Sequence, residues 1–192
     1  MGGKSEIGSV GHGFADISPN GLHIPDGDAI TAEDLSQIFG IDCRLATQEA
    51  LVEMGVFREG QRLEFFDNPK PHIYLRDEKE IVSSALYFVD MVVGDDAVMA
   101  SYVPQHREST RHLHRFGISE LYRSIAGRAN LRLKNQTVEL GEHNRDFTVE
   151  EHSIHQFSTN SSPAFTLLIM RNAGLVHRDL WHEMSDEEVV ID

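Results

Sequence analysis

The sequence predicts an all-β domain, a sandwich or a closed barrel, preceded by a short helical segment. From residue 56 onward, short segments rich in Val, Ile, Phe and Tyr alternate with polar stretches, which is typical of strands. Turn residues such as Gly94-Asp95-Asp96 and Asn135-Gln136 separate these segments at short spacing. Many short strands joined by tight turns favour a sandwich or barrel, because closing the sheet removes its exposed edges.

The expected strands follow one another closely along the chain. They cover residues 63–66, 72–76, 81–93, 97–103, 120–126, 129–134, 137–140, 145–149, 155–159 and 164–171.

Two helices are expected before the strands. Thr31 has the properties of an N-cap, Asp34 is its partner in a capping box, and Gly40 ends the first helix. A second helix is expected over residues 44–54, closed by Gly55. The apolar positions are Leu35, Ile38 and Phe39 in the first helix and Leu45, Leu51 and Val52 in the second.

The chain therefore divides into four expected parts. Residues 1–30 form a loose N-terminal segment, 31–55 a helical appendage, 56–175 the barrel and 176–192 a C-terminal tail. The Gly-rich start lacks the apolar run of a signal peptide, and no run approaches the ~20 apolar residues of a membrane helix. A single cysteine, Cys43, cannot form an internal disulfide, which fits a reducing compartment. We therefore expect a cytoplasmic protein without a membrane segment.

The charge balance argues against a nucleic-acid partner. The 17 basic and 31 acidic residues give a formal net charge of −14, which repels phosphate backbones. The two helices, with Gly40-Ile41 between them, suggest a helix-turn-helix, but residues 31–55 contain five acidic residues and one basic residue. A recognition helix needs positive charge, so a packing or dimer-contact role is favoured instead.

The candidate metal-ligating residues lie between residues 112 and 155. His112 and His114 are two residues apart, so on a strand their side chains point to the same face. Glu120 begins the next apolar segment, with Tyr122 on its face, and His155 begins a later strand. A barrel could bring these segments together. Three imidazoles and one carboxylate suit Fe(II), Mn(II), Ni(II) or Zn(II) better than Ca(II), which prefers oxygen ligands.

This pattern resembles the cupin superfamily over residues 97–171. The first cupin motif contains His-x-His, then Glu, then six residues and Gly, as do His112, His114, Glu120 and Gly127 here. His155 stands at the histidine of the second motif. The departures concern turn residues and spacing: five residues separate His114 from Glu120, and His106, Glu150 and His152 replace motif Gly and Pro residues.

The resemblance implies a double-stranded β-helix, or jelly-roll, barrel that holds one divalent metal ion through His112, His114, Glu120 and His155. It also implies a small-molecule substrate and a homodimer. The leading functional interpretation is a non-haem dioxygenase that uses Fe(II). A metal-dependent isomerase, epimerase or lyase acting on a sugar or small acid is an alternative, with Tyr122 or His106 moving the proton. The third interpretation is a non-catalytic binding protein.

Overall fold

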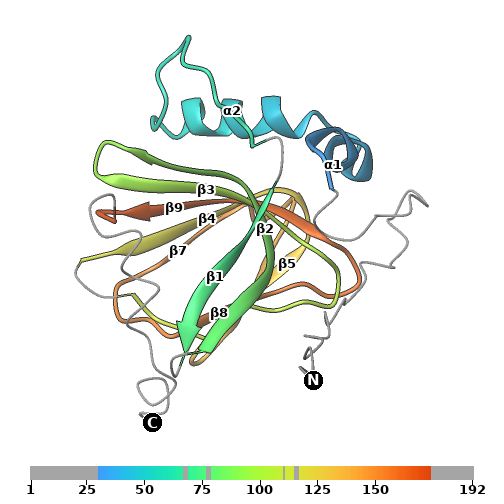
Figure 1. Cartoon of the computed structure of the whole chain (residues 1–192). Coiled ribbons are helices and arrows are strands. Elements are labelled where there is room, and N and C mark those ends of the chain that lie inside the picture. The colour runs from blue at the N-terminus through green and yellow to red at the C-terminus, as the bar shows by residue number, and fades with distance from the viewer. Residues whose placement is uncertain (1–29, 67–68, 77–78, 110, 115–116, 174–192) are drawn as a thin grey trace, which may run out of the picture.

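The computed structural model describes residues 30–66, 69–76, 79–109, 111–114 and 117–173 (Figure 1). The expected loose N-terminal segment, apart from Ile30, and the expected C-terminal tail lie outside these described residues. The helices and strands are α1 (Ala32–Phe39), α2 (Cys43–Glu53), β1 (Lys70–Arg76), β2 (Lys79–Val93), β3 (Asp96–Val103), β4 (Ser119–Gly127), β5 (Ala129–Leu133), β6 (Thr137–Leu140), β7 (Asp146–Val149), β8 (His155–Ser158) and β9 (Ala164–Arg171).

The strands form two antiparallel sheets. The larger has the order β1-β2-β3-β9-β4-β7 and the smaller the order β6-β5-β8. Isolated bridges join Glu108 to Ser158 and His112 to His155. They pair the segment before β4 with the side of β8 that does not contact β5. This pairing confirms the predicted all-β, double-stranded β-helix fold with a short N-terminal helical segment. The expected strand over residues 63–66 is wrong: this stretch is irregular, although the Phe66 amide donates to the Phe88 carbonyl over 2.9 Å.

Alternate residues of the larger sheet contribute to two separate cores. On β9, Phe165, Leu167 and Ile169 face the helices, while Leu168 and Met170 face the barrel interior. β3 is divided in the same way. Figure 1 shows α1 and α2 lying across the outer side of this sheet. Covering both faces explains why β3 and β9 are buried along almost their whole length and read as continuous apolar runs.

The two ends of α1 form as the sequence predicts. The Thr31 hydroxyl accepts from the Asp34 amide over 3.1 Å, and the Asp34 carboxylate accepts from the Thr31 amide over 2.9 Å. Gly40 ends α1 with a φ of 68°, a left-handed conformation that glycine adopts at little cost. Asp42 caps α2 by accepting from the Arg44 and Leu45 amides.

Of the three apolar positions that the sequence analysis names in α2, only Leu51 is buried. Leu45 and Val52 are 52% and 37% exposed. The stripe that packs inward is Cys43, Thr47, Ala50 and Leu51. These positions have helical spacing, but Thr47 and Ala50 carry a weak hydrophobic signal, so the larger side chains misled the sequence prediction. Small residues on this face let the helix lie close to its neighbours. No helix in the described part of the chain is long and apolar enough to cross a membrane.

Candidate metal centre

Strand pairing brings the two sequence motifs together. His112 and His155 exchange both backbone hydrogen bonds, over 3.0 and 2.9 Å, as residues directly opposite in an antiparallel pair do. The two rings therefore lie side by side, with centroids 4.2 Å apart. The carbonyl of His114 accepts from the His152 amide over 2.8 Å, which fixes the second histidine of the pair against the turn before β8.

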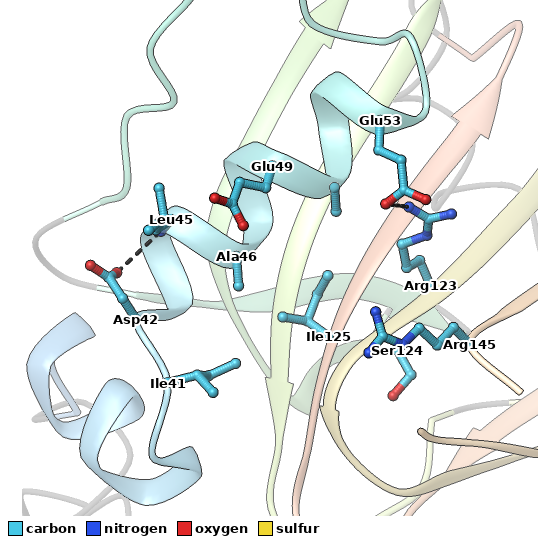
Figure 2. A pocket seen from close by; sticks show the side chains of 11 residues that line it. Ile41, Asp42, Leu45, Ala46, Glu49, Glu53, Arg123, Ser124, Ile125 and Arg145 are labelled. Carbon is cyan, nitrogen blue, oxygen red and sulfur yellow. Dashed lines mark hydrogen bonds and ion pairs between the residues drawn. The ribbon is translucent and has the colours of Figure 1, made fainter. Parts of the chain in front are cut away.

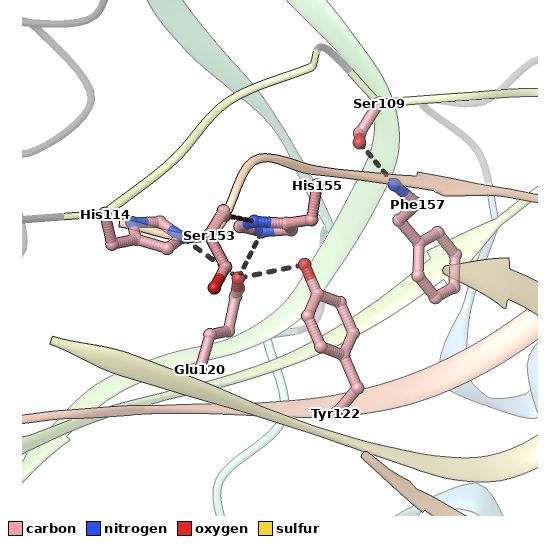
Figure 3. Close-up of polar contacts among 7 residues, drawn as sticks. All are labelled: Ser109, His114, Glu120, Tyr122, Ser153, His155 and Phe157. Atoms are coloured by element: carbon pink, nitrogen blue, oxygen red, sulfur yellow. Dashed lines mark hydrogen bonds and ion pairs between the residues drawn. The ribbon is translucent and has the colours of Figure 1, made fainter. Parts of the chain in front are cut away.

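β4 supplies the remaining groups from the opposite sheet. Glu120 and Tyr122 point inward on alternate positions, because Leu121 between them packs toward the helices. Figure 3 shows the Glu120 carboxylate directed at the rings of His114 and His155. Its Oε2 lies 3.0 Å from His114 Nε2, 2.9 Å from His155 Nε2 and 2.9 Å from the Tyr122 hydroxyl.

The four predicted ligand residues form one buried cluster. His112, His114, Glu120 and His155 are 6%, 4%, 0% and 0% exposed. One ligand atom from each lies within 4.8 Å of all the others. The structure therefore assembles the residues that the sequence motifs single out, including Glu120, despite the longer segment before it. Such a donor set is typical of a divalent transition-metal site.

The hydrogen bonding around His155 fits a cation in the cluster. Its Nδ1 lies 2.9 Å from the Ser153 carbonyl, which can only accept, so Nδ1 carries a hydrogen. In the neutral ring Nε2 then presents a lone pair to the Glu120 carboxylate. Two lone pairs at that distance repel each other unless a cation, a proton or a metal ion, lies between them. A carbonyl that holds the far nitrogen of a ligating histidine is a common arrangement around protein metals.

Glu120 also retains capacity for a cation. Its Oε1 is buried and has no hydrogen-bond partner among the described residues. Leaving such an oxygen unsatisfied costs about 1–3 kcal/mol, more for a charged group. Burial opposes ionisation of Glu120, but the charges and hydrogen bonds of His114 and His155 outweigh it and hold the carboxyl pKa well below its usual range. The carboxylate is therefore in the anionic form that a metal requires.

Tyr122 lies against this cluster. Its ring stacks on Phe157 with an interplanar angle of 12° and a centroid distance of 5.6 Å. The hydroxyl donates to Glu120 Oε2. Burial, and then the negative charge of Glu120, raise the pKa of Tyr122 well above its ordinary value. The phenol consequently keeps its proton in this arrangement.

His106, the other residue predicted to move a proton, lies elsewhere. It is exposed, and its backbone amide donates to the Asn160 carbonyl over 2.9 Å. His112 pairs with His155, so the partners of the two histidines, Asn160 and His155, are five positions apart in the chain. No contact joins His106 to the four clustered side chains within the described ranges, and its role stays a prediction.

A groove lies on the outer side of the larger sheet, between α2 and the middle of β4 (Figure 2). Its volume is about 480 Å³, and its lining includes Leu45, Glu49, Arg123 and Arg145. Arg123 donates through Nε to Asp146 over 2.7 Å and through Nη1 to Glu53 over 3.1 Å. This groove shares no residue with the metal-type cluster.

Solved structures that are similar to this chain include several at low sequence identity. No family model matches the sequence, and no curated protein gives a significant match. A crystal structure of the DMSP lyases RdDddP and RnDddQII is 23% identical with a TM-score of 0.41, over 47% of this chain and 49% of that chain. KdgF from Halomonas sp. is 11% identical with a TM-score of 0.42, over 46% of this chain and 79% of that one.

A cupin 2 conserved barrel domain protein from Salinispora arenicola is 18% identical with a TM-score of 0.40, over 49% of this chain and 79% of that chain. The similar structures thus include cupin and double-stranded β-helix proteins. The fold of this chain is assigned from its own strand pairing. The fold and the cluster define a double-stranded β-helix protein with a buried site of three histidines and one glutamate.

Proposed function

We propose that this protein is a metal-dependent lyase or isomerase that moves a proton on a small sugar or acid. The observation that carries the proposal is the Tyr122 hydroxyl, which is buried beside the cluster and hydrogen-bonded to the Glu120 carboxylate. A proton-bearing group next to a metal-type site is what proton-transfer chemistry needs.

Each residue has a distinct role in this proposal. His112, His114, Glu120 and His155 hold a divalent metal ion, which when bound polarises a carbonyl, carboxylate or hydroxyl of the substrate. Ser153 orients His155 through its carbonyl. Phe157 holds the Tyr122 ring in place by stacking.

Tyr122 acts first as a general acid, because its raised pKa keeps the hydroxyl protonated. In a lyase, Tyr122 gives its proton to the leaving group as that bond breaks, and the resulting phenolate takes the proton of the neighbouring carbon, whose C–H electrons form the new double bond. In an isomerase, the proton goes to the carbonyl oxygen and the phenolate takes the proton of the adjacent carbon, which gives an enediol. Tyr122 then protonates the other carbon of that double bond and takes the proton of its second hydroxyl, so that it is a phenol again at the end. The buried position excludes bulk water from this transfer.

The test compares Tyr122→Phe with the parent protein after loading with Mn(II), Zn(II) or Fe(II). We expect metal content to be unchanged and turnover of the responsive substrate to fall about 100-fold or more, the usual worth of a positioned acid or base. Incorporation of deuterium from heavy water at a substrate carbon should fall in parallel. Full turnover by Tyr122→Phe would overturn the role of Tyr122, and substrate turnover by metal-free protein would overturn the metal dependence.

A second candidate function is an Fe(II)-dependent dioxygenase, favoured by the apolar surroundings of the site. The interior core around Tyr122 consists of side chains such as Met99, Ile118, Leu131 and Leu168. Apolar walls suit an alkyl or aromatic substrate and exclude water from oxygen chemistry. Substrate-dependent oxygen consumption by the Fe(II)-loaded protein would support this candidate, and its absence across substrates that the metal-loaded protein binds would exclude it.

A further inference from the structure

Three side chains that carry a hydroxyl group form a row across the larger sheet. The row crosses β4 at Ser124, two residues after Tyr122. Ser101 on β3 pairs in register with Thr166 on β9, and Thr166 pairs with Ser124 on β4. Tyr87 on β2 pairs with Ser101 and continues the row at its outer end. The row was not visible in the sequence, because it depends on the register of four strands that are distant in the chain.

The row faces the inside of the barrel. On β9, the residues on either side of Thr166, Phe165 and Leu167, pack toward the helices, so Thr166 points the other way. The same alternation holds around Ser101, whose neighbours Ala100 and Tyr102 belong to the helix-side core. Ser124 follows Glu120 and Tyr122 on the buried positions of β4, and part of the residue also lines the groove under α2 (Figure 2).

These hydroxyls are deeply buried without protein partners. Ser101, Thr166 and Ser124 are 3%, 1% and 7% exposed. Within the described part of the chain, none of the three side chains makes a hydrogen bond. Ser158, on the outer side of β8, differs because its hydroxyl bonds to the Asn130 carbonyl. The oxygens of Ser101, Thr166 and Ser124 are not among the fully enclosed side-chain atoms that lack a partner, so the three hydroxyls keep some accessible surface and can bond to a ligand.

We propose that Ser101, Thr166 and Ser124 form a subsite that binds an uncharged, hydroxyl-bearing part of the substrate. This inference rests on the proposed function, because the metal would hold the other end of the same molecule. Ser124 lies two residues beyond Tyr122 on β4, or about 7 Å along the strand. The subsite is therefore within reach of a substrate of a few carbon atoms.

The charge of the interior sets the ligand class. Among the described residues, no lysine or arginine is buried, and Glu120 is the one buried carboxylate. A second anionic group on the substrate would have no countercharge at the row, and burying an unpaired charge is costly. Hydroxyl groups, which donate and accept, match Ser and Thr without this cost. A polyhydroxylated acid, bound to the metal by its carboxylate, fits both ends.

The test measures binding to the Zn(II)-loaded protein by calorimetry, without relying on turnover. The probes are three pairs of equal chain length: glycerate and propanoate, threonate and butanoate, gluconate and hexanoate. We expect the wild-type protein to prefer the hydroxylated member of at least one pair by about tenfold or more. Thr166→Val and Ser124→Ala should each lower that preference about fivefold, the usual effect of losing one hydrogen bond. Affinity for the unhydroxylated acid should stay unchanged.

Thr166→Ser, which keeps the hydroxyl, and Ser158→Ala, outside the barrel, are the matched controls and should retain the full preference. Absence of a preference in all three pairs, or equal weakening of both members in the variants, would overturn the subsite. A soaked crystal with gluconate that shows only water on the three hydroxyls would also overturn it. Loss of the preference in Thr166→Val while Tyr122→Phe keeps full turnover would refute the proposed acid and leave the subsite intact.

Discussion

The Glu120 carboxylate connects most of the groups in the cluster, since one oxygen meets His114, His155 and Tyr122. Its second oxygen has no hydrogen-bond partner in the described residues. An oxygen that is buried, anionic and incompletely satisfied is the strongest single indication of a bound cation in this structure.

The first prediction concerns His112 and His114, the two clustered histidines of the segment before β4. Replacing both His112 and His114 by Ala removes two of four nitrogen and oxygen ligands, so bound metal should fall from about one ion per chain to nearly none. His106→Ala is the matched control, because His106 is exposed and far from the cluster. Metal analysis of the purified proteins checks both. Full metal content in the double variant would contradict the site.

Metal binding should also depend on pH. A histidine ligates through a deprotonated nitrogen, so protons compete with the metal ion and affinity should fall as pH is lowered. Titrating Zn(II) at several pH values measures this. Affinity that is constant between pH 5 and 8 would be inconsistent with imidazole ligands.

At the scale of helices and strands, the sequence predicted positions better than orientations. β3 and β9 are recognisable from their apolar, β-branched runs, and the start of α1 from Thr31, whereas the Asp42 cap of α2 was not predicted. The predicted ligand residues also lie together, because residue spacing on a strand determines which face a side chain takes. The hydroxyl row and the inward face of α2 depend on long-range packing, which no local pattern contains.

The orientation of α2 gives a second prediction with an internal control. Leu51 is fully buried and Leu45 is 52% exposed, on the same helix. Leu51→Ala should lower the free energy of unfolding by about 2–5 kcal/mol, the usual cost of a large cavity in a core. Leu45→Ala should change it by less than about 0.5 kcal/mol. Denaturant unfolding of both variants measures the difference, and equal effects would show that α2 is rotated.

The reactivity of the Cys43 thiol, at the start of α2, measures how easily this helix opens. Burial raises the pKa of its thiol to about 12, so very little reactive thiolate exists at neutral pH. We expect Cys43 to react with a thiol reagent far more slowly in the folded protein than in denaturant, where its pKa is about 8.5. Leu51→Ala should accelerate the reaction by making the opening of α2 easier. A fast reaction in the native protein would contradict the buried position.

For the whole molecule, the outward face of α2 is relevant to assembly. Ile41, which precedes α2, and Leu45 and Val52 within it are 37%, 52% and 37% exposed, and the spacing of Leu45 and Val52 places them on one side of the helix. Glu49 lies among them, and Arg145, which makes no ion pair with a described residue, lines the same groove (Figure 2). A patch with both an acidic and a basic group can be complementary to itself, as a twofold-symmetric contact requires.

We therefore expect a homodimer that pairs through α2, with a mass of 43.2 kDa, twice the 21.6 kDa of the chain. The net charge of −14 makes two copies repel each other, so added salt should strengthen the dimer by screening that repulsion. Leu45→Glu with Val52→Glu places charge on the apolar stripe and should give monomers with unchanged metal content. Light scattering at micromolar concentration and two salt concentrations measures this. A monomeric wild-type protein at both would contradict the dimer, and a dimer that survives both substitutions would place the contact on another face.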